Sequence, residues 1–431
     1  MRINLCVIGG GSSYTPELFA DLAAFGEQVD VERVTLVDPD DVKLAFIGGV
    51  CERLVSESGL HLQLRSTTRL EDGLAGADFV ILQIRVGGLA ARVRDETLPM
   101  RFDMVGNETT GAGGFVCALR TVPAALEIAQ AIERVAPQAC LLNLSNPGGI
   151  VTEALLKHSR VRTLGFCNIP INTATALAEV LGVEVSRVQL DSFGLNHLSW
   201  TRAARVDGID ALGPLIREAR SRDSILYQRG LVDDLIDPDW LQALGMLPGW
   251  YLRYFYYPEQ VLEADRREGQ SRGEADMLAE RRLREIYTSS GFGREAQVVL
   301  EQKGGAQYYW PVLQAIASIA HDRGDVIVAD VQNAGAVADL PDAVCVEVPA
   351  RIGRQSAIAL PQGRLPSSVR GLVQAVKAYE ELTVEAAVSG DRTTALAALV
   401  ANPLVGSPAR ARPFLDQALE KERALLPRFW G

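Results

Sequence analysis

Short runs of β-branched and other apolar residues alternate with amphipathic helical patterns along residues 1–170. This alternation is typical of a parallel sheet with helices on both of its faces. Strands are expected at Ile3–Ile8, Val34–Val37, Leu62–Ser66, Phe79–Ile84, Cys140–Leu144 and Thr163–Phe166. The sequence therefore predicts a doubly wound α/β domain that ends near residue 195.

One helical pattern lies between the fourth and the fifth of these strands. Apolar residues recur at helical spacing from Val122 to Ala136, and Thr121 stands where an N-terminal cap is expected. Pro137 follows, and a proline there stops a helix. We expect a crossover helix that begins after Thr121 and ends before Pro137.

Helical patterns dominate the rest of the chain. Ser368 opens a long amphipathic pattern, and a shorter one follows Gly390. The segment Asp325–Glu347 alternates β-branched runs with turn residues, which indicates a few strands among the helices. A second, helix-rich α+β domain is therefore expected over residues 196–431, after a first domain over residues 1–195.

Length, composition and charge narrow the function classes. A chain of 431 residues exceeds the size at which a single core keeps growing, so two domains are expected. The net charge of −11 disfavours a nucleic-acid partner, because phosphate backbones are bound by an excess of Lys and Arg. We expect no membrane partner and a cytoplasmic location, since we see neither an apolar run of ~18 residues nor a signal peptide.

Cysteines and histidines are few and scattered. The 6 cysteines form no Cys-x-x-Cys pair and have no regular spacing, which argues against a disulfide framework or a structural zinc site. With only 4 histidines, a metal site built from several of them is not expected. Any metal would need other ligands.

A glycine-rich turn follows the first strand. Gly9 and Gly11 match a Gly-x-Gly pattern and Ser12 follows, while Tyr14 takes the place usual for a third glycine. Such a turn brings backbone N–H groups to a pyrophosphate, although a tight turn without a ligand has the same composition. Asp38 ends the next strand, where a carboxylate binds a ribose 2′-OH and repels a 2′-phosphate. These residues favour a Rossmann-like domain that binds NAD rather than NADP.

Six short motifs occur in an order that resembles one enzyme family. They are Ile8–Glu17, Arg85–Gly88, Asn107–Gly111, Leu144–Pro147, Phe166–Pro170 and Gly194–Trp200. Together they resemble the NAD- and metal-dependent glycoside hydrolases of family four, and most of all its 6-phospho-β-glucosidases. Each motif is short, but the six in this order are specific to the family.

The resemblance implies a function. It implies hydrolysis of 6-phospho-β-glycosides by NAD-dependent oxidation at C3, deprotonation at C2, elimination, addition of water and re-reduction. The implied substrate is a phosphorylated disaccharide or an aryl glycoside, and the implied assembly is a homodimer or homotetramer. The implied cofactors are NAD and a divalent metal, which in this family is typically manganese. The second domain would then hold substrate and metal and form the oligomer.

The resemblance also implies roles for particular residues. Cys167 and His197 match the two protein ligands of the metal, although by sequence rules alone Cys167 reads as a packed thiol. Thiolate and imidazole would suit zinc or iron by softness, so the ligand types do not select manganese. Tyr251 matches the base at C2, but it stands among several aromatic residues that must mostly pack. Asn168 stands where α-specific relatives have Asp, which favours β-linked substrates.

Four further residues match substrate-binding positions. Arg92 matches an arginine that holds the 6-phosphate, with a solvated surface arginine as the alternative, and Arg272 matches a second phosphate ligand. Asn146 would bind sugar hydroxyls at the end of a strand. Glu108 is expected in the site, and an ion pair with a nearby arginine is the competing interpretation.

Two other functions remain open from the sequence. An NAD-dependent 2-hydroxyacid dehydrogenase would have a similar doubly wound domain and the Asn-Pro pair at Asn146 and Pro147. A nucleotide-sensing protein without turnover would keep the fold as well. The joint presence of Cys167, His197, Tyr251 and Arg92 argues against the sensor.

Overall fold

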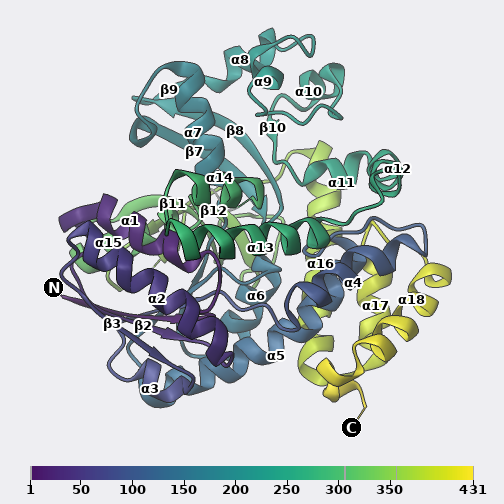
Figure 1. The fold of residues 1–431 in the computed structure, drawn as a ribbon. Helices are drawn as coiled ribbons and strands as arrows, with labels where there is room; N and C mark the ends of the chain where they lie inside the picture. Colours follow the sequence, from purple (N-terminus) through teal and green to yellow (C-terminus); the bar gives the residue numbers. More distant parts are fainter. Residues whose placement is uncertain (1, 305–306, 356, 431) are drawn as a thin grey trace.

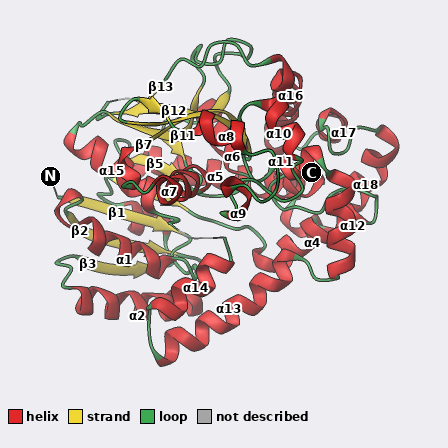
Figure 2. Ribbon diagram, turned by 90° about the horizontal axis from the view of Figure 1, so that it is seen from above, coloured by secondary structure: helices red, strands yellow, loops and turns green. Residues whose placement is uncertain are grey.

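The computed structural model describes residues 2–304, 307–355 and 357–430 and is built around one large sheet (Figure 1). This sheet has nine strands in the order β13-β12-β11-β6-β5-β4-β1-β2-β3. Helices pack on both of its faces (Figure 2), which confirms the doubly wound α/β architecture. Its strands are β1 Ile3–Ile8, β2 Val31–Val37, β3 Gln63–Thr67, β4 Phe79–Leu82, β5 Cys140–Asn143, β6 Arg162–Gly165, β11 Asp325–Gln332, β12 Cys345–Ile352 and β13 Ala357–Ala359.

All six strands expected in the first part of the chain are present, and β1 has the predicted bounds. Residues of β4 and β5 are buried without exception, because helices cover both faces of the sheet at its centre. Such strands appear in a sequence as continuous apolar runs. Strand β3 lies at the edge and is half exposed, and its bounds are one residue off the expected ones.

The sheet does not end with the first part of the chain. Strand β11 pairs antiparallel with β6 through Asp330 and Gly165, and β12 and β13 continue the sheet in antiparallel fashion. The strands expected within Asp325–Glu347 therefore exist, but they complete the sheet of the first domain. The main chain beyond residue 195 thus contributes to both parts of the molecule.

A smaller sheet and most of the helices make up the second part. Strands β7 Val188–Leu195, β8 Leu198–Val206, β9 Ile209–Asp210 and β10 Leu247–Pro248 form an antiparallel sheet. This sheet stands with α8, α9 and α10 as a lobe above the large sheet (Figure 1). The helices of this part are α8 Leu212–Glu218, α9 Ile225–Gln228, α10 Pro238–Leu244, α11 Leu252–Tyr256, α12 Pro258–Glu268, α13 Arg272–Ser289, α14 Arg294–Gln302, α15 Trp310–His321, α16 Ser367–Ser389, α17 Arg392–Ala401 and α18 Pro408–Lys421. The two helical patterns predicted near the C-terminus are α16 and α17.

The crossover helix starts earlier than the sequence predicts. The helices of the first part are α1 Thr15–Phe25, α2 Asp41–Ser58, α3 Leu70–Leu74, α4 Gly88–Met100, α5 Gly111–Val135, α6 Gly148–His158 and α7 Ile169–Leu181. Thr121 lies inside α5 and donates its hydroxyl to the carbonyl of Cys117 at 2.9 Å, so its assignment as a cap was wrong. The helix ends at Val135, before Pro137, as predicted.

The start of α5 was missed because it is rich in glycine, a poor helix former. A Cβ atom at Gly113 would lie 2.2 Å from the carbonyl oxygens of Asn107 and Asp95, so only glycine permits this close packing. By length and composition alone, the helix could cross a membrane. However, 78% of its apolar window is buried inside the protein, as in the core helix of a globular domain.

A buried ion cluster joins α16 to α6. The Lys377 side chain is 2% exposed, and its Nζ lies 2.6 Å from Glu153 and 2.5 Å from Glu380. Both carboxylates are buried as well, so Lys377 neutralises charges that water cannot reach. The cluster holds the C-terminal helices against the large sheet.

We expect Lys377→Met to lower the free energy of unfolding by about 3–5 kcal/mol, because it leaves the buried Glu380 without its cation and Glu153 with Lys157 alone. Urea denaturation followed by circular dichroism measures this effect. Lys421→Met, at an exposed lysine of α18, is the matched control and should change stability little. Equal losses of unfolding free energy in the two variants would show that the ion cluster does not stabilise the fold more than an exposed lysine does.

Candidate active site

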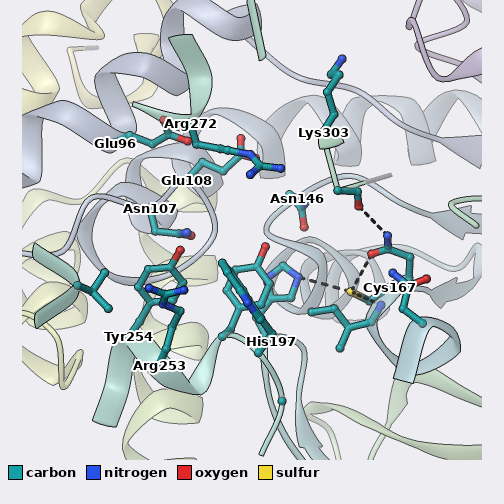
Figure 3. A pocket seen from close by; sticks show the side chains of 18 of the residues that line it. Glu96, Asn107, Glu108, Asn146, Cys167, His197, Arg253, Tyr254, Arg272 and Lys303 are labelled. Atoms are coloured by element: carbon teal, nitrogen blue, oxygen red, sulfur yellow. Dashed lines mark hydrogen bonds between the residues drawn. The ribbon is translucent and has the colours of Figure 1, made fainter. Parts of the chain in front are cut away.

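A cleft opens where the parallel strands of the large sheet end. Its volume is about 1320 Å³, above the ~300–1,000 Å³ usual for a site that holds one small ligand. Its wall runs from Tyr14, after β1, to the turn that carries Trp250 and Tyr251, before α11. The carboxyl ends of parallel strands are the usual place for ligands in such folds. The cleft is therefore the candidate active site (Figure 3).

The glycine-rich turn lies at one end of this cleft. The amides of Gly9 and Gly10 both donate to the carbonyl of Val37 at 2.9 Å, which ties the turn to β2. Gly9 has φ +89°, and a Cβ there would lie 2.5 Å from the carbonyl oxygen of Gln83, so the turn requires glycine. The amide of Gly11 donates to Asp38 at 3.1 Å. The structure thus brings Gly9, Gly11, Ser12 and Asp38 together just outside the cleft wall.

Tyr14, in place of a third glycine, forms part of the cleft wall. Its ring stacks on Tyr308 with centroids 5.0 Å apart, and the Nζ of Lys303 lies 4.7 Å from the ring centre. Lys303 also lies 3.0 Å from the hydroxyl of Ser13. Sequence reasoning did not identify Lys303 and Tyr308 as neighbours of this loop, because they come almost 300 residues later in the chain.

Cys167 and His197 meet in the middle of the cleft, although they are 30 residues apart. Cys167 follows β6, and His197 forms the tip of the β7–β8 hairpin, with φ +63°. The Cys167 Sγ and the His197 Nε2 are 3.6 Å apart, close enough for both to bind one cation. Among the described residues no group of three or more His, Cys, Asp and Glu could hold a metal. A cation at this pair would take its other ligands from substrate or water.

Burial controls the protonation of this pair. It lowers the pKa of His197 to about 4 against the opposing charge of Glu108, so the imidazole is neutral at pH 7 and can bind a metal. Burial also raises the pKa of the Cys167 thiol, as does the negative charge of Glu347. A cation is what would favour the thiolate here. The donor set therefore fits a divalent metal.

Tyr251 lies directly on His197. The two rings are parallel within 10°, and their centroids are 3.9 Å apart. Burial raises the pKa of the Tyr251 phenol above its ordinary value, and the nearby Tyr254, Cys167 and Glu108 raise it further. The phenol therefore needs a neighbouring cation before it can act as a base. A metal ion bound at the adjacent Cys167–His197 pair would be such a cation.

Glu108 and Arg92 belong to one ion network in the cleft wall. Glu108 is buried and pairs with Arg85, and its carboxylate lies 3.2 Å from Arg92. Arg92 also pairs with Glu96 at 2.8 Å and with Asp276 at 2.5 Å. The pKa of the Glu108 carboxyl stays below its usual value because the two guanidinium groups outweigh burial. The ion pair weighed against a site role for Glu108 is thus present, and Arg92 is no solvated surface residue.

Asn146 and Arg272 lie at other parts of the wall. Asn146 comes soon after β5, and its side chain faces the cleft in Figure 3. Arg272 begins α13 at the rim, donates to the carbonyl of Gln302 at 2.6 Å and lies 3.7 Å from Asp276. Its side chain is 53% exposed, so it can turn towards an anion in the cleft. All substrate-binding candidates therefore border one cavity.

Two residues behind the site were not singled out from the sequence. Asn196 precedes His197 and donates to the carboxylate of Glu347 at 2.9 Å. Glu347 is buried on β12, and burial raises its pKa to about 7. Asn196 was inside a quoted motif, which was a usable signal. Glu347 ends the segment for which strands were expected, and only the pairing of β12 into the large sheet brings it here.

The whole chain is similar to known proteins. The model of the family 4 glycosyl hydrolases matches residues 4–183, and the model of their C-terminal domain matches residues 192–405. A probable 6-phospho-β-glucosidase of Bacillus subtilis is 37% identical over 100% of this chain and 98% of its own length. A 6-phospho-β-glucosidase of Thermotoga maritima is 30% identical over 98% of this chain and 99% of its own.

Solved structures agree with these matches. The Thermotoga maritima 6-phospho-β-glucosidase with NAD and glucose-6-phosphate aligns over 99% of both chains, with a TM-score of 0.90 and 29% identity. A 6-phospho-α-glucosidase from gut microorganisms with NAD and Mn²⁺ aligns over 99% of both chains, with a TM-score of 0.85 and 26% identity.

A malate dehydrogenase of Plasmodium falciparum is similar in fold alone. Its identity is 13% and its TM-score 0.55, over 90% of this chain and 99% of its own. The likeness to dehydrogenases seen in the sequence therefore concerns the fold and carries no evidence about activity. The motifs, the Cys167–His197 pair and the family matches across both parts of the chain lead to one conclusion. This chain belongs to glycosyl hydrolase family 4.

Proposed function

We propose that this protein hydrolyses 6-phospho-β-glycosides with the help of NAD and a divalent metal. The observation that carries the proposal is the Cys167–His197 pair, 3.6 Å apart and stacked against Tyr251, in a cleft that begins at a dinucleotide turn. The chemistry is oxidation at sugar C3, deprotonation at C2, elimination of the leaving group, addition of water and re-reduction. The hydride returns to C3, so no net redox change occurs, and a proton from solvent or the base is added at C2.

The glycine-rich turn would hold the nicotinamide cofactor. Gly9, Gly11 and Ser12 would let the pyrophosphate approach the start of α1 closely, and Asp38 would bind a ribose hydroxyl. When bound, this cofactor would take up the hydride from C3 and give it back. NAD in the solved relatives supports this assignment.

The Cys167–His197 pair would hold the metal. When bound, a divalent cation would polarise the sugar oxygens at C2 and C3 and so acidify the C2 proton. Tyr251 would remove that proton. Manganese in a solved relative favours this ion over the zinc or iron that the ligand types alone would suit.

Four residues would position the sugar. Arg272 and Arg92 would bind the 6-phosphate, Arg272 directly at the rim and Arg92 from within its network of carboxylates. Asn146 and Glu108 would bind sugar hydroxyls. Because Glu108 is held by Arg85 and Arg92, its oxygens keep a defined direction.

The side chain next to Cys167 favours β-linked substrates. Asn168 donates to the carbonyl of Gly304 at 2.7 Å, and an amide cannot protonate a leaving group as a carboxylic acid can. The β-specific relatives support the same assignment. A homodimer or homotetramer in the cytoplasm remains our prediction from the sequence.

We expect Arg272→Ala to raise KM about tenfold or more for an aryl 6-phospho-β-glucoside, and little for the unphosphorylated glucoside. The reason is that a charge-assisted hydrogen bond contributes about 1.5 kcal/mol or more. Steady-state kinetics with both substrates, NAD+ and Mn²⁺ measures this difference. The same assay tests the function, since cleavage without net NADH formation excludes a simple dehydrogenase.

Arg267→Ala is the matched control. Arg267 is an arginine of α12 whose side chain is 75% exposed, and it lies outside the cleft wall. Arg92→Ala is less informative, because it would also leave Glu96, Glu108 and Asp276 without their shared cation. If Arg272→Ala changed KM equally for both substrates, Arg272 would not contact the phosphate. If the unaltered enzyme cleaved no 6-phosphorylated glycoside, the proposed function itself would be wrong.

A further inference from the structure

A large aromatic side chain is exposed at the rim of the cleft. Trp250 lines the cleft, yet 45% of its surface is open to solvent. Large exposed apolar side chains are ordinary when scattered over a surface, but one at the mouth of a cleft is a candidate ligand contact. It lies one residue before Tyr251, so it borders the place where the bond to the leaving group would break.

The turn that carries Trp250 is rigidly held. Gly249 donates its amide to the carbonyl of Ser199 at 2.9 Å, and a Cβ at Gly249 would lie 2.9 Å from that same oxygen. The amide of Arg253 donates to the carbonyl of Trp250 at 3.4 Å, which closes the turn into α11. Strand β8 therefore fixes the backbone on which the indole stands.

Neighbouring rings fix the indole itself. Trp250 packs edge to face with Tyr251 at 5.3 Å and with Tyr254 at 5.9 Å, with interplanar angles of 85° and 80°. A side chain that is already held in one conformation loses little conformational entropy when a ligand binds to it. The exposed part of the indole is thus a preorganised surface for ligand binding.

Arg253 covers one side of this surface. Its guanidinium carbon lies 5.1 Å from the Trp250 ring, and its Nη1 pairs with Asp233 at 2.9 Å. In Figure 3, Arg253 and Tyr254 lie on one side of His197, and Cys167 lies on the other. Because Tyr251 stacks on His197 and Trp250 packs against Tyr251, a sugar bound at the Cys167–His197 pair would have Trp250 nearby in the cleft wall.

We propose that Trp250, backed by Arg253, forms the subsite for the leaving group of the substrate. The proposal rests on the proposed function. An indole face binds flat, weakly polar surfaces, such as an aryl ring or the C–H face of a pyranose. It offers no hydrogen-bond pattern that would select one polar group. The natural leaving group is therefore a ring with an apolar face, not a short alkyl or charged group.

The test uses glycosides that share the 6-phospho-β-glucosyl group and differ in the leaving group: phenyl, glucosyl and methyl. The quantity compared is kcat/KM for each, in the unaltered enzyme, in Trp250→Ala and in Trp250→Phe. Trp250→Ala should lose about tenfold more kcat/KM for the phenyl and glucosyl compounds than for the methyl compound. Trp250→Phe should recover much of this difference, because it keeps an aromatic face.

Leaving groups also differ in reactivity, so each loss is taken relative to the unaltered enzyme with the same compound. Leu278→Ala, which truncates a side chain that is 54% exposed and outside the cleft wall, is the control. An equal loss for all three compounds would mean that Trp250 only supports Tyr251, and it would overturn the subsite. No loss for any compound would overturn it too. Either result leaves the proposed function standing, provided that the unaltered enzyme cleaves the series.

Discussion

Cys167→Ser and His197→Ala are each expected to abolish turnover while NAD binding stays close to that of the unaltered enzyme. The two side chains converge at 3.6 Å and are the only protein ligands that we assign to the metal. A serine hydroxyl is a much weaker metal ligand than a thiolate, and alanine provides no ligand at all. The dinucleotide turn, in contrast, is built from Gly9, Gly11 and Asp38 at the end of β1 and β2.

The expected loss in kcat is on the order of 10³-fold or more, or about 4 kcal/mol of transition-state stabilisation. Activity is measured over a range of Mn²⁺ concentrations, bound manganese by metal analysis, and NAD affinity by titration calorimetry. Cys51→Ser, at a buried cysteine of α2, and His61→Ala, at an exposed histidine, are the controls. Near-normal activity of either site variant in metal-depleted buffer would disprove the metal assignment.

The second prediction with a large expected effect concerns deuterium incorporation at C2 of the product. Turnover in D₂O should give sugar product with deuterium at C2, because elimination breaks the C2–H bond and a proton from solvent later replaces it. A glycosidase that works with two carboxylates never breaks that bond. NADH should not accumulate, since the hydride returns to C3. Mass spectrometry and proton NMR of the product measure the incorporation.

Tyr251→Phe tests which residue removes the C2 proton. The variant keeps the ring that stacks on His197 at 3.9 Å, so it should retain the packing and the affinity for NAD and metal. We expect kcat and the C2 exchange to fall by roughly 10²–10⁴-fold, the usual contribution of a positioned base. Tyr254→Phe, whose ring lies 5.8 Å from that of Tyr251, is the matched control.

The possible results test the elimination mechanism and the role of Tyr251 separately. Product without deuterium at C2 would rule out elimination altogether. Normal exchange in Tyr251→Phe would rule out only the tyrosine as base. Steady accumulation of NADH would instead support the dehydrogenase alternative.

Local sequence patterns predicted most of the large sheet. Strands β1, β4 and β5 are nearly or fully buried, so almost every position in them must be apolar and the pattern is visible without tertiary information. The same applies to the glycine-rich turn, since the positive φ of Gly9 and its contact with Gln83 exclude other residues. The prediction of where α5 begins was wrong. The glycines at its start are poor helix formers, and Gly113 is needed there because it packs against the carbonyl oxygen of Asn107.

The ion network around Arg92 could not be predicted. Glu96 lies one turn away on the same helix, but Asp276 comes 184 residues later, on α13. No local pattern reports a partner that distant. The structure therefore adds that Arg92, for which a phosphate-binding role remains a proposal, belongs to a buried ion network.

By itself, the sequence determined the element types, the dinucleotide turn and the order of the family motifs, because these depend on residues close together in the chain. Only the tertiary structure decided that β11–β13 complete the first sheet and that Cys167 and His197 meet. Cys167 and His197 meet because the end of β6 and the tip of the β7–β8 hairpin lie next to each other. Such long-range geometry is set by the packing of whole elements, which leaves no local pattern in the sequence.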